Sequence, residues 1–451
     1  MNQVSSDCQD NLVRLLKRAV VDFGMKHIET ARGYGCSELQ LGVALKQLFD
    51  AGDVKREDLI LQTKVGATAF AGDFRKTLET SFATLQVDYL DLFAFHGLNM
   101  DYQYDWVFGE SREGGNCMDV VKEYVAAGKI RHVGFSTHAP EDLIRRFIQT
   151  DAFEYINLHY HYFGSYTTTG VGKTQGNLEN IQLLKEKDMG VFVISAYDKG
   201  GKLYEPSNKL RTLCLPEMEP MAFGSAWLWN HSNTEGSPVH TIVVGAARPA
   251  DVDQGAVAAY LQGSNPDDTL QKVMTVTNRL EKAKEDALGK EWLKTCYEGV
   301  PKSNNSKYQV EHNQIIWCYN NIKAFGMLQF AKDRYGSLES NRAKWDNEKT
   351  AEENIEILKG SGWGYVPGLS LEEGKDYIDD FGHVPAVNKS NVLEAEAFVH
   401  SWCRKRKVVE LKGAEGGGEG QVDEEKLEPP RDWQTAYIMK PWVDFPDRPR
   451  S

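Results

Sequence analysis

The chain has 451 residues, a formal net charge of −13 and seven cysteines. This length fits one large barrel or sandwich of about 250 residues with an appendage. The negative charge argues against binding to nucleic acid or to an anionic membrane by bulk electrostatics, so it favours a small-molecule partner. The cysteines form neither a CxxC pair nor a zinc-finger spacing with histidine. We therefore expect free thiols and no metal site.

Neither a membrane span nor a secretory leader is evident in the sequence. No stretch approaches the about 18 apolar residues of a transmembrane helix, and residues 1–16 lack the basic start and apolar core of a signal peptide. We expect a soluble chain that is cytoplasmic by default. Organelle targeting stays open, since the recorded start could lie downstream of the natural one.

Short apolar runs rich in β-branched residues recur along the first part of the chain. They span residues 26–30, 59–65, 90–96, 130–136, 155–160, 191–197 and 240–246. Helical patterns lie between them, and the first runs from Asn11 to Phe23 and stops at Gly24. Because most of the runs are apolar throughout, they are typical of parallel strands covered on both faces. The alternation predicts an α/β protein.

Two parallel architectures fit this pattern, a closed barrel and an open doubly wound sheet. An open sheet that binds a dinucleotide should show GxGxxG after its first strand, but residues 33–38 provide only GxG. We therefore predict a (β/α)8 TIM barrel. Only seven strands are found and the chain opens with a helix, so the first strand is missing and the natural protein could begin further upstream.

The character of the sequence changes near residue 265. Residues 1–265 are predicted to form the barrel, and residues 266–410 a helical C-terminal region with apolar residues at helical spacing between 312 and 336. Residues 411–451 are predicted to be a flexible linker and tail, because 411–430 are too poor in apolar residues to fold alone.

Four residues at consecutive strand ends could transfer a proton. A Tyr34 hydroxyl titrates near pH 10, and the Lys64 ammonium would lower its pKa by stabilising the phenolate. Glu29 could hold Lys64 charged, and His96 could bind the substrate oxygen. Each residue alone also has an ordinary structural explanation, as a turn aromatic, a strand end, a cap or a core histidine. Their joint position at the strand ends favours carbonyl reduction by hydride.

Five blocks of the sequence resemble, in order and spacing, the aldo-keto reductases. They are "HIETARGYGCSELQLGVAL", "LILQTKVG", "YLDLFAFHG", "IRHVGFSTH" and "VVGAARP". The resemblance implies a (β/α)8 barrel and an NADPH-dependent reductase. By the same resemblance Tyr34 is the general acid, Lys64 tunes it and His96 orients the carbonyl. Glu29 anchors Lys64 where the family usually has Asp.

The resemblance also implies cofactor contacts. Ser136 and Asn157 match positions that hold the nicotinamide carboxamide, and the loop with Gly245 and Arg248 resembles the one that grips the adenosine phosphate. Arg248 is the obvious cation for a 2′-phosphate, so NADPH is predicted and NADH stays the alternative. The helical C-terminal region resembles a branch of the family that has such an extension. Some relatives in that branch bind an iron–sulfur cluster, but the cysteines here are too scattered for one.

The sequence leaves three functions open. The first is an NADPH-dependent reductase of a small carbonyl substrate. The second is a barrel that binds nucleotide as a sensor or scaffold without turnover, whose C-terminal region contacts a protein partner. The third is a shortened gene product that folds poorly.

Overall fold

The computed structural model describes residues 5–109, 114–164, 177–198, 206–230, 239–360 and 368–404. These residues belong to one compact unit. Residues 411–451, for which the sequence predicts a linker and tail, lie outside the described ranges. Among the described helices, none combines the length and the apolar composition needed to cross a membrane.

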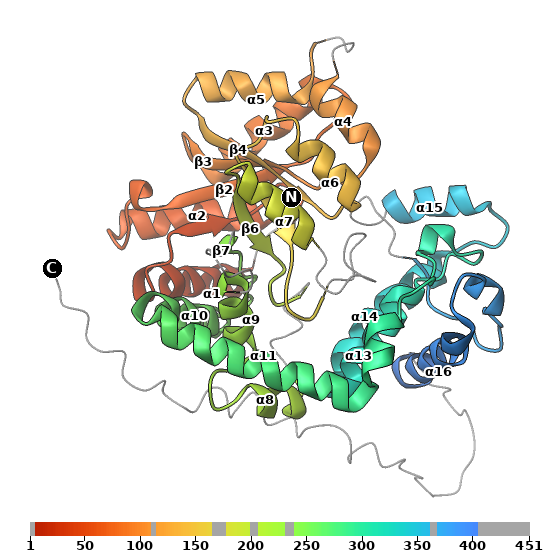
Figure 1. Cartoon of the computed structure of the whole chain (residues 1–451). Coiled ribbons are helices and arrows are strands. Elements are labelled where there is room, and N and C mark those ends of the chain that lie inside the picture. The colour runs from red at the N-terminus through yellow and green to blue at the C-terminus, as the bar shows by residue number, and fades with distance from the viewer. Residues whose placement is uncertain are drawn as a thin grey trace, which may run out of the picture. The chain divides into compact units, whose positions relative to one another are not determined.

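In the described residues, seven parallel strands form one sheet in strictly sequential order, β1 to β7, of which Figure 1 labels β2, β3, β4, β6 and β7. Their bounds are β1 (His27–Glu29), β2 (Ile60–Val65), β3 (Leu90–Phe95), β4 (Ile130–Thr137), β5 (Tyr155–His159), β6 (Gly190–Ile194) and β7 (Val239–Ile242). Each strand overlaps one of the seven predicted runs. A doubly wound sheet would reverse its order at a switch point, so the sequential order is that of a barrel. The predicted fold class is confirmed.

The sheet curls around a polar interior. The Asn157 side chain on β5 accepts a hydrogen bond from Gln62 on β2 at 2.7 Å and donates one to Glu29 on β1 at 2.8 Å. Because β5 is not the neighbour of β1 or β2, these bonds cross the inside of the sheet. Within the described residues no pairing joins β1 to β7, as expected from a barrel that lacks a strand.

Helices connect the strands and cover the outside of the sheet, and α3 and α5 lie along β2 to β4 in Figure 1. The helices of this part are α1 (Ser6–Leu16), the π-helix η1 (Lys17–Asp22), α2 (Ser37–Asp50), η2 (Arg56–Asp58), α3 (Ala71–Leu85), α4 (Asp101–Phe108), α5 (Cys117–Ala126), α6 (Glu141–Ile148), α7 (Leu178–Glu186), α8 (Asn208–Cys214), α9 (Pro220–Asn230), η4 (Pro249–Val252) and α10 (Asp253–Ser264). The predicted stop at Gly24 is present, with a left-handed φ of 68° that suits glycine.

Close packing between helices depends on small residues at a few points. A Cβ on Gly42 of α2 would lie 2.5 Å from the Thr84 carbonyl oxygen of α3. Only a residue without a side chain lets these two helices approach so closely. Helix α2 begins just after the turn that carries Tyr34, so this packing also fixes that turn.

The C-terminal region is helical, and α13, α14 and α16 pack against one another (green to blue in Figure 1). Its helices are α11 (Pro266–Leu288), α12 (Lys290–Thr295), η5 (Ser303–Asn305), α13 (His312–Phe325), α14 (Leu328–Lys344), α15 (Ala351–Gly360), η6 (Ile378–Phe381) and α16 (Ala386–Cys403). The helical pattern predicted for residues 312–336 corresponds to α13 and α14, which are separated by Gly326 in the left-handed region.

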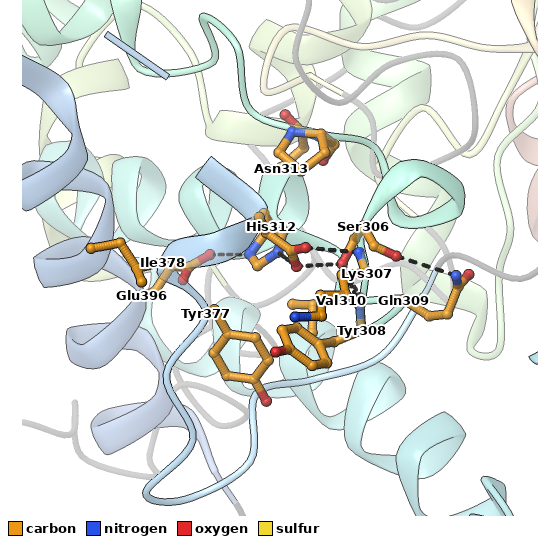
Figure 2. Close-up of polar contacts among 12 residues, drawn as sticks. Ser306, Lys307, Tyr308, Gln309, Val310, His312, Asn313, Tyr377, Ile378 and Glu396 are labelled. Carbon is orange, nitrogen blue, oxygen red and sulfur yellow. Dashed lines mark hydrogen bonds and ion pairs between the residues drawn. The ribbon is translucent and has the colours of Figure 1, made fainter. Parts of the chain in front are cut away.

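A buried histidine joins three elements of this region (Figure 2). His312, at the start of α13, contacts Glu396 of α16 through Nδ1 and Asp380 of η6 through Nε2, the latter at 2.9 Å. Asp380 also accepts hydrogen bonds from the Ser306 hydroxyl at 2.6 Å and the Lys307 backbone N–H at 2.7 Å. Burial lowers the pKa of His312, but the two carboxylates outweigh it and raise that pKa to about 9. The imidazolium therefore acts as a buried cross-link.

Candidate active site

The C-terminal ends of β1, β2 and β3 bring four of the predicted residues together. Glu29 is the last residue of β1, Lys64 is the next-to-last of β2 and His96 directly follows β3. Tyr34 lies in the turn before α2, where its backbone N–H donates to the Ala31 carbonyl at 3.0 Å. Glu29, Tyr34, Lys64 and His96 all line one cavity of about 1310 Å³. Parallel strands end on the same edge, so the topology gathers these side chains.

Glu29 and Lys64 form a buried ion pair. The Lys64 Nζ contacts Glu29 Oε1, and the two side chains are 1% and 6% exposed. A buried ammonium requires such a partner, because an isolated charge would be too costly to desolvate. The second oxygen of Glu29 accepts the hydrogen bond from Asn157. The longer side chain of Glu29, where the resembled family usually has Asp, thus still reaches the lysine.

The polar interior extends from this pair through a chain of amides. Asn157 accepts from Gln62, and the Gln62 side-chain oxygen contacts Nε2 of His27 at 2.9 Å. The sequence prediction placed Asn157 among the cofactor contacts, whereas its observed partners are Glu29 and Gln62. Its amide positions Glu29, and through Glu29 it positions Lys64.

Tyr34 lies between Lys64 and His96. The Tyr34 and His96 rings meet edge to face, with centroids 5.2 Å apart, and Lys64 Nζ lies 5.0 Å from the Tyr34 ring centroid. The ammonium is therefore close enough to act electrostatically on the phenol. Gly33 lies beside this arrangement, since a Cβ there would be in van der Waals contact with the His96 ring at 3.4 Å.

The electrostatics of Tyr34 differ from the prediction. Although 41% of Tyr34 stays exposed, desolvation in the cavity is the largest influence on its hydroxyl and raises its pKa above the ordinary value of 10. Lys64 acts in the predicted direction and lowers the pKa, but Glu29 raises it and offsets part of that effect. The net direction of the pKa shift is upward because desolvation outweighs the lowering by Lys64, which Glu29 partly offsets.

Three of the four predicted cofactor residues line the same cavity, namely Ser136, Gly245 and Arg248. The Ser136 hydroxyl accepts a hydrogen bond from the Gly97 N–H at 2.9 Å, which fixes the loop after β3. Arg248 donates to Asp251 Oδ1 from Nε at 3.0 Å and from Nη2 at 2.7 Å, and 52% of its side chain stays exposed. The Arg248 guanidinium is thus held in one orientation at the cavity wall. The roles of Ser136, Gly245 and Arg248 in binding a cofactor remain predictions.

The C-terminal region also contributes to the cavity, which the sequence did not reveal. Gln329, Phe330 and Asp333 of α14 line it. The neighbouring Arg334 is buried, and its Nε lies 2.7 Å from Oδ2 of Asp198, which follows β6. Helix α14 is therefore tied to a strand end of the sheet. Periodicity could identify the helix, but only the folded chain shows which side chains reach the cavity.

Comparison with known families agrees with this geometry. Residues 6–200 match the model of the aldo/keto reductase family. This part of the chain is therefore similar to the aldo/keto reductases. The matched range covers α1 to β6 and so includes Glu29, Tyr34, Lys64 and His96. The resemblance stated from the sequence blocks is confirmed.

Individual aldo/keto reductases align over shorter stretches. "Aldo-keto reductase family 1 member C13" of Mus musculus is 33% identical over 135 residues, which is 28% of this chain and 42% of the mouse protein. "Aldo-keto reductase family 4 member C11" of Arabidopsis thaliana is 40% identical over 79 residues, or 17% and 25% of the two chains. The alignments thus span less than half of each relative.

Solved structures of the family are similar over a longer range. The holo form of the aldo-keto reductase AKR11C1 from Bacillus halodurans is 19% identical, with a TM-score of 0.46 over 59% of this chain and 87% of that one. An aldo-keto reductase from Klebsiella pneumoniae in complex with NADPH is 20% identical, with a TM-score of 0.43 over 58% and 87%.

Proposed function

We propose that this chain binds a nicotinamide dinucleotide, NADPH in preference to NADH, and reduces an aldehyde or ketone to an alcohol. One observation carries the proposal: Tyr34 faces both His96 and Lys64 in one cavity, and Lys64 is paired with a buried carboxylate. A phenol, an ammonium and an imidazole around a common space suit proton donation to a carbonyl oxygen. The match of residues 6–200 to the model of the aldo/keto reductase family supports the same reaction class.

Tyr34 donates the proton in this mechanism. Its raised pKa keeps the hydroxyl protonated at neutral pH, so the acid is present in the form that the reaction consumes. The phenolate that remains after the transfer is stabilised by the Lys64 ammonium, and this stabilisation grows as charge develops. Glu29 and Asn157 hold the ammonium in place. His96 donates a hydrogen bond to the carbonyl oxygen and orients it toward the Tyr34 hydroxyl.

The cavity fits a dinucleotide together with a substrate. Its volume of about 1310 Å³ exceeds the roughly 300–1,000 Å³ of ordinary small-molecule sites. The cofactor, when bound, supplies the hydride for the carbonyl carbon. Ser136 offers a hydroxyl toward its amide. A Cβ on Gly245 would meet no heavy atom within 4 Å, so the backbone there is open to a ligand. The oriented Arg248 guanidinium suits a 2′-phosphate.

The decisive test replaces the Tyr34 hydroxyl. Tyr34→Phe should retain NADPH binding, followed by cofactor fluorescence, while turnover over a panel of aldehydes and ketones falls by about 10²- to 10⁴-fold. Tyr260→Phe is the matched control, because Tyr260 is exposed on α10 and should leave both measurements unchanged.

Two results would contradict the proposal. If Tyr34→Phe turned over substrate at the parent rate, Tyr34 would not be the acid. If the parent chain bound NADPH but reduced no carbonyl in the panel, the chain would instead be a nucleotide-binding barrel without turnover.

A contact between the C-terminal region and a protein partner remains a prediction.

A further inference from the structure

Two histidines and an aspartate lie together where β5 and β6 end. His159 is the last residue of β5 and pairs in register with Ile194, the last residue of β6. His161 follows two positions later, and side chains at i and i+2 of an extended chain point to the same side. The chain after β6 turns tightly, with the Asp198 N–H donating to the Ser195 carbonyl at 2.9 Å and Asp198 in the left-handed region at φ 62°. This turn carries the Asp198 carboxylate back toward the two imidazoles.

The three side chains are close and shielded from solvent. One nitrogen of each imidazole and one carboxylate oxygen all lie within 4.8 Å of one another, and His159, His161 and Asp198 are each buried. The His161 Nε2 lies 4.0 Å from Asp198 Oδ1, which is too far for a hydrogen bond.

His161 gives an independent sign that a ligand belongs at this position. Neither of its ring nitrogens has a hydrogen-bond partner among the residues that the structure describes. Buried polar atoms are nearly always satisfied, because leaving one unpaired costs free energy. A metal ion would satisfy one nitrogen by coordination, and an imidazole nitrogen is among the commonest protein ligands of metals.

Arg334 orients the carboxylate of Asp198. The Arg334 Nε lies 2.7 Å from Oδ2 of Asp198, and the other oxygen, Oδ1, lies 4.0 Å from His161 Nε2. Ligands of metal sites are commonly fixed by such outer contacts. Because Arg334 offsets the charge of Asp198, a bound dication would need a further anion. Asp198 is also among the residues that line the large cavity.

We propose that His159, His161 and Asp198 bind one divalent transition-metal ion at the end of β5 and β6. Two imidazole nitrogens and one carboxylate oxygen suit Zn²⁺ and Fe²⁺. Three protein ligands leave a fourth position of a tetrahedral ion for a water or a small anion. Cysteine and histidine spacing did not predict this site, because its ligands come from two strand ends. The inference does not depend on the reductase proposal.

The experiment measures metal binding by the full chain. All proteins carry Cys8→Ser and Cys36→Ser, since these thiols are the ones that reach solvent among the described cysteines. After treatment with EDTA, each is titrated calorimetrically with ZnSO4 and, without oxygen, with FeSO4. Bound metal is counted by mass spectrometry after gel filtration. We expect about one ion per chain.

Variants test whether the three side chains are the ligands. His161→Ala and Asp198→Asn should each weaken metal binding by about 100-fold or more. His132→Ala is the control, because His132 is exposed on β4 and its partner is Glu154. His161→Cys retains a ligand atom, so with Co²⁺ it should add a thiolate-to-cobalt absorption band. A merely structural His161 would produce no such band.

Each outcome of the titrations either supports or overturns the metal site. Binding of either ion that His161→Ala and Asp198→Asn abolish in proteins with parent-like circular dichroism supports the site. If the variants misfold, the cobalt spectrum of His161→Cys decides, and absence of the thiolate band overturns the proposal. Failure of the parent chain to bind either ion, or equal binding by parent and variants, also overturns it.

Discussion

The buried cross-link at His312 predicts that the stability of this protein falls as the pH rises above neutrality. Its imidazole is buried between Asp380 and Glu396, which raise its pKa to about 9 against an ordinary 6.5. The folded state therefore holds the proton more tightly than the unfolded state. Stabilisation by the imidazolium is fully present below pH 6.5 and is lost as the pH rises through 9.

The magnitude follows from the difference between the two pKa values. Each unit of pKa difference is worth about 1.4 kcal/mol, and the two pKa values of His312 differ by about 2.5 units. The imidazolium therefore adds about 3 kcal/mol to the free energy of unfolding near pH 6 and less than about 0.5 kcal/mol at pH 9. His312→Gln removes the titrating group and leaves two buried carboxylates facing each other. We expect it to destabilise the chain by about 3 kcal/mol or more at pH 6, and the gap to the parent to narrow toward pH 9.

The assay is urea unfolding of the full chain between pH 6 and 9.5, followed by tryptophan fluorescence, for the parent, His312→Gln and His132→Gln. Titrating groups remote from His312 are common to the parent and His312→Gln, so their contributions cancel in the difference. The difference therefore reports His312 together with Glu311 and Glu396, whose pKa values His312 lowers. His132→Gln removes an exposed histidine and should follow the parent curve. If the parent and His312→Gln showed the same pH dependence, the imidazolium would not be the cross-link.

Two further predictions concern the active site. Glu29→Gln leaves the buried Lys64 ammonium without its counter-charge, so the free energy of unfolding should fall by about 3–5 kcal/mol and turnover should fall as well. Glu29→Asp keeps the charge and should lose much less of both. Equal unfolding midpoints for Glu29→Gln and the parent would refute the role of the ion pair. Arg248→Met should raise the Kd for NADPH by about 10- to 100-fold and leave the Kd for NADH unchanged, as measured by cofactor fluorescence. A parallel loss of both affinities would mean that Arg248 is structural.

Local patterns in the sequence were sufficient to predict the sheet. All seven strands lie within or beside the predicted runs, and the helix before Gly24 ends where expected. The positions of Glu29, Lys64 and His96 at strand ends followed from the rule that parallel strands finish on one edge. The strand topology alone therefore predicted that these three side chains lie close together.

The local sequence pattern did not predict which hydrogen-bond and charge partners a buried side chain has. Asn157 was predicted to contact the cofactor, which stays a prediction, and in the folded chain its amide contacts Glu29 and Gln62 across the inside of the sheet. Lys64 lowers the pKa of Tyr34 as predicted, but the net shift is upward because desolvation, which the prediction could not weigh, is larger and Glu29 adds to it. The partners of Asn157 and the desolvation of Tyr34 both depend on how closely the side chains around the cavity pack against one another.

The sequence by itself determined the order of strands and helices and the end of the sheet at which the candidate catalytic residues lie, while the roles of those residues stay predictions. Both the order and that end follow from periodicity and from the handedness of short connections, which are properties of neighbouring residues. Tertiary structure alone decided the contact of α14 with the cavity, the cross-link at His312 and the meeting of His159 and His161 with Asp198. Each joins residues far apart in the chain, and their distances depend on the curvature of the sheet and the packing of helices on it.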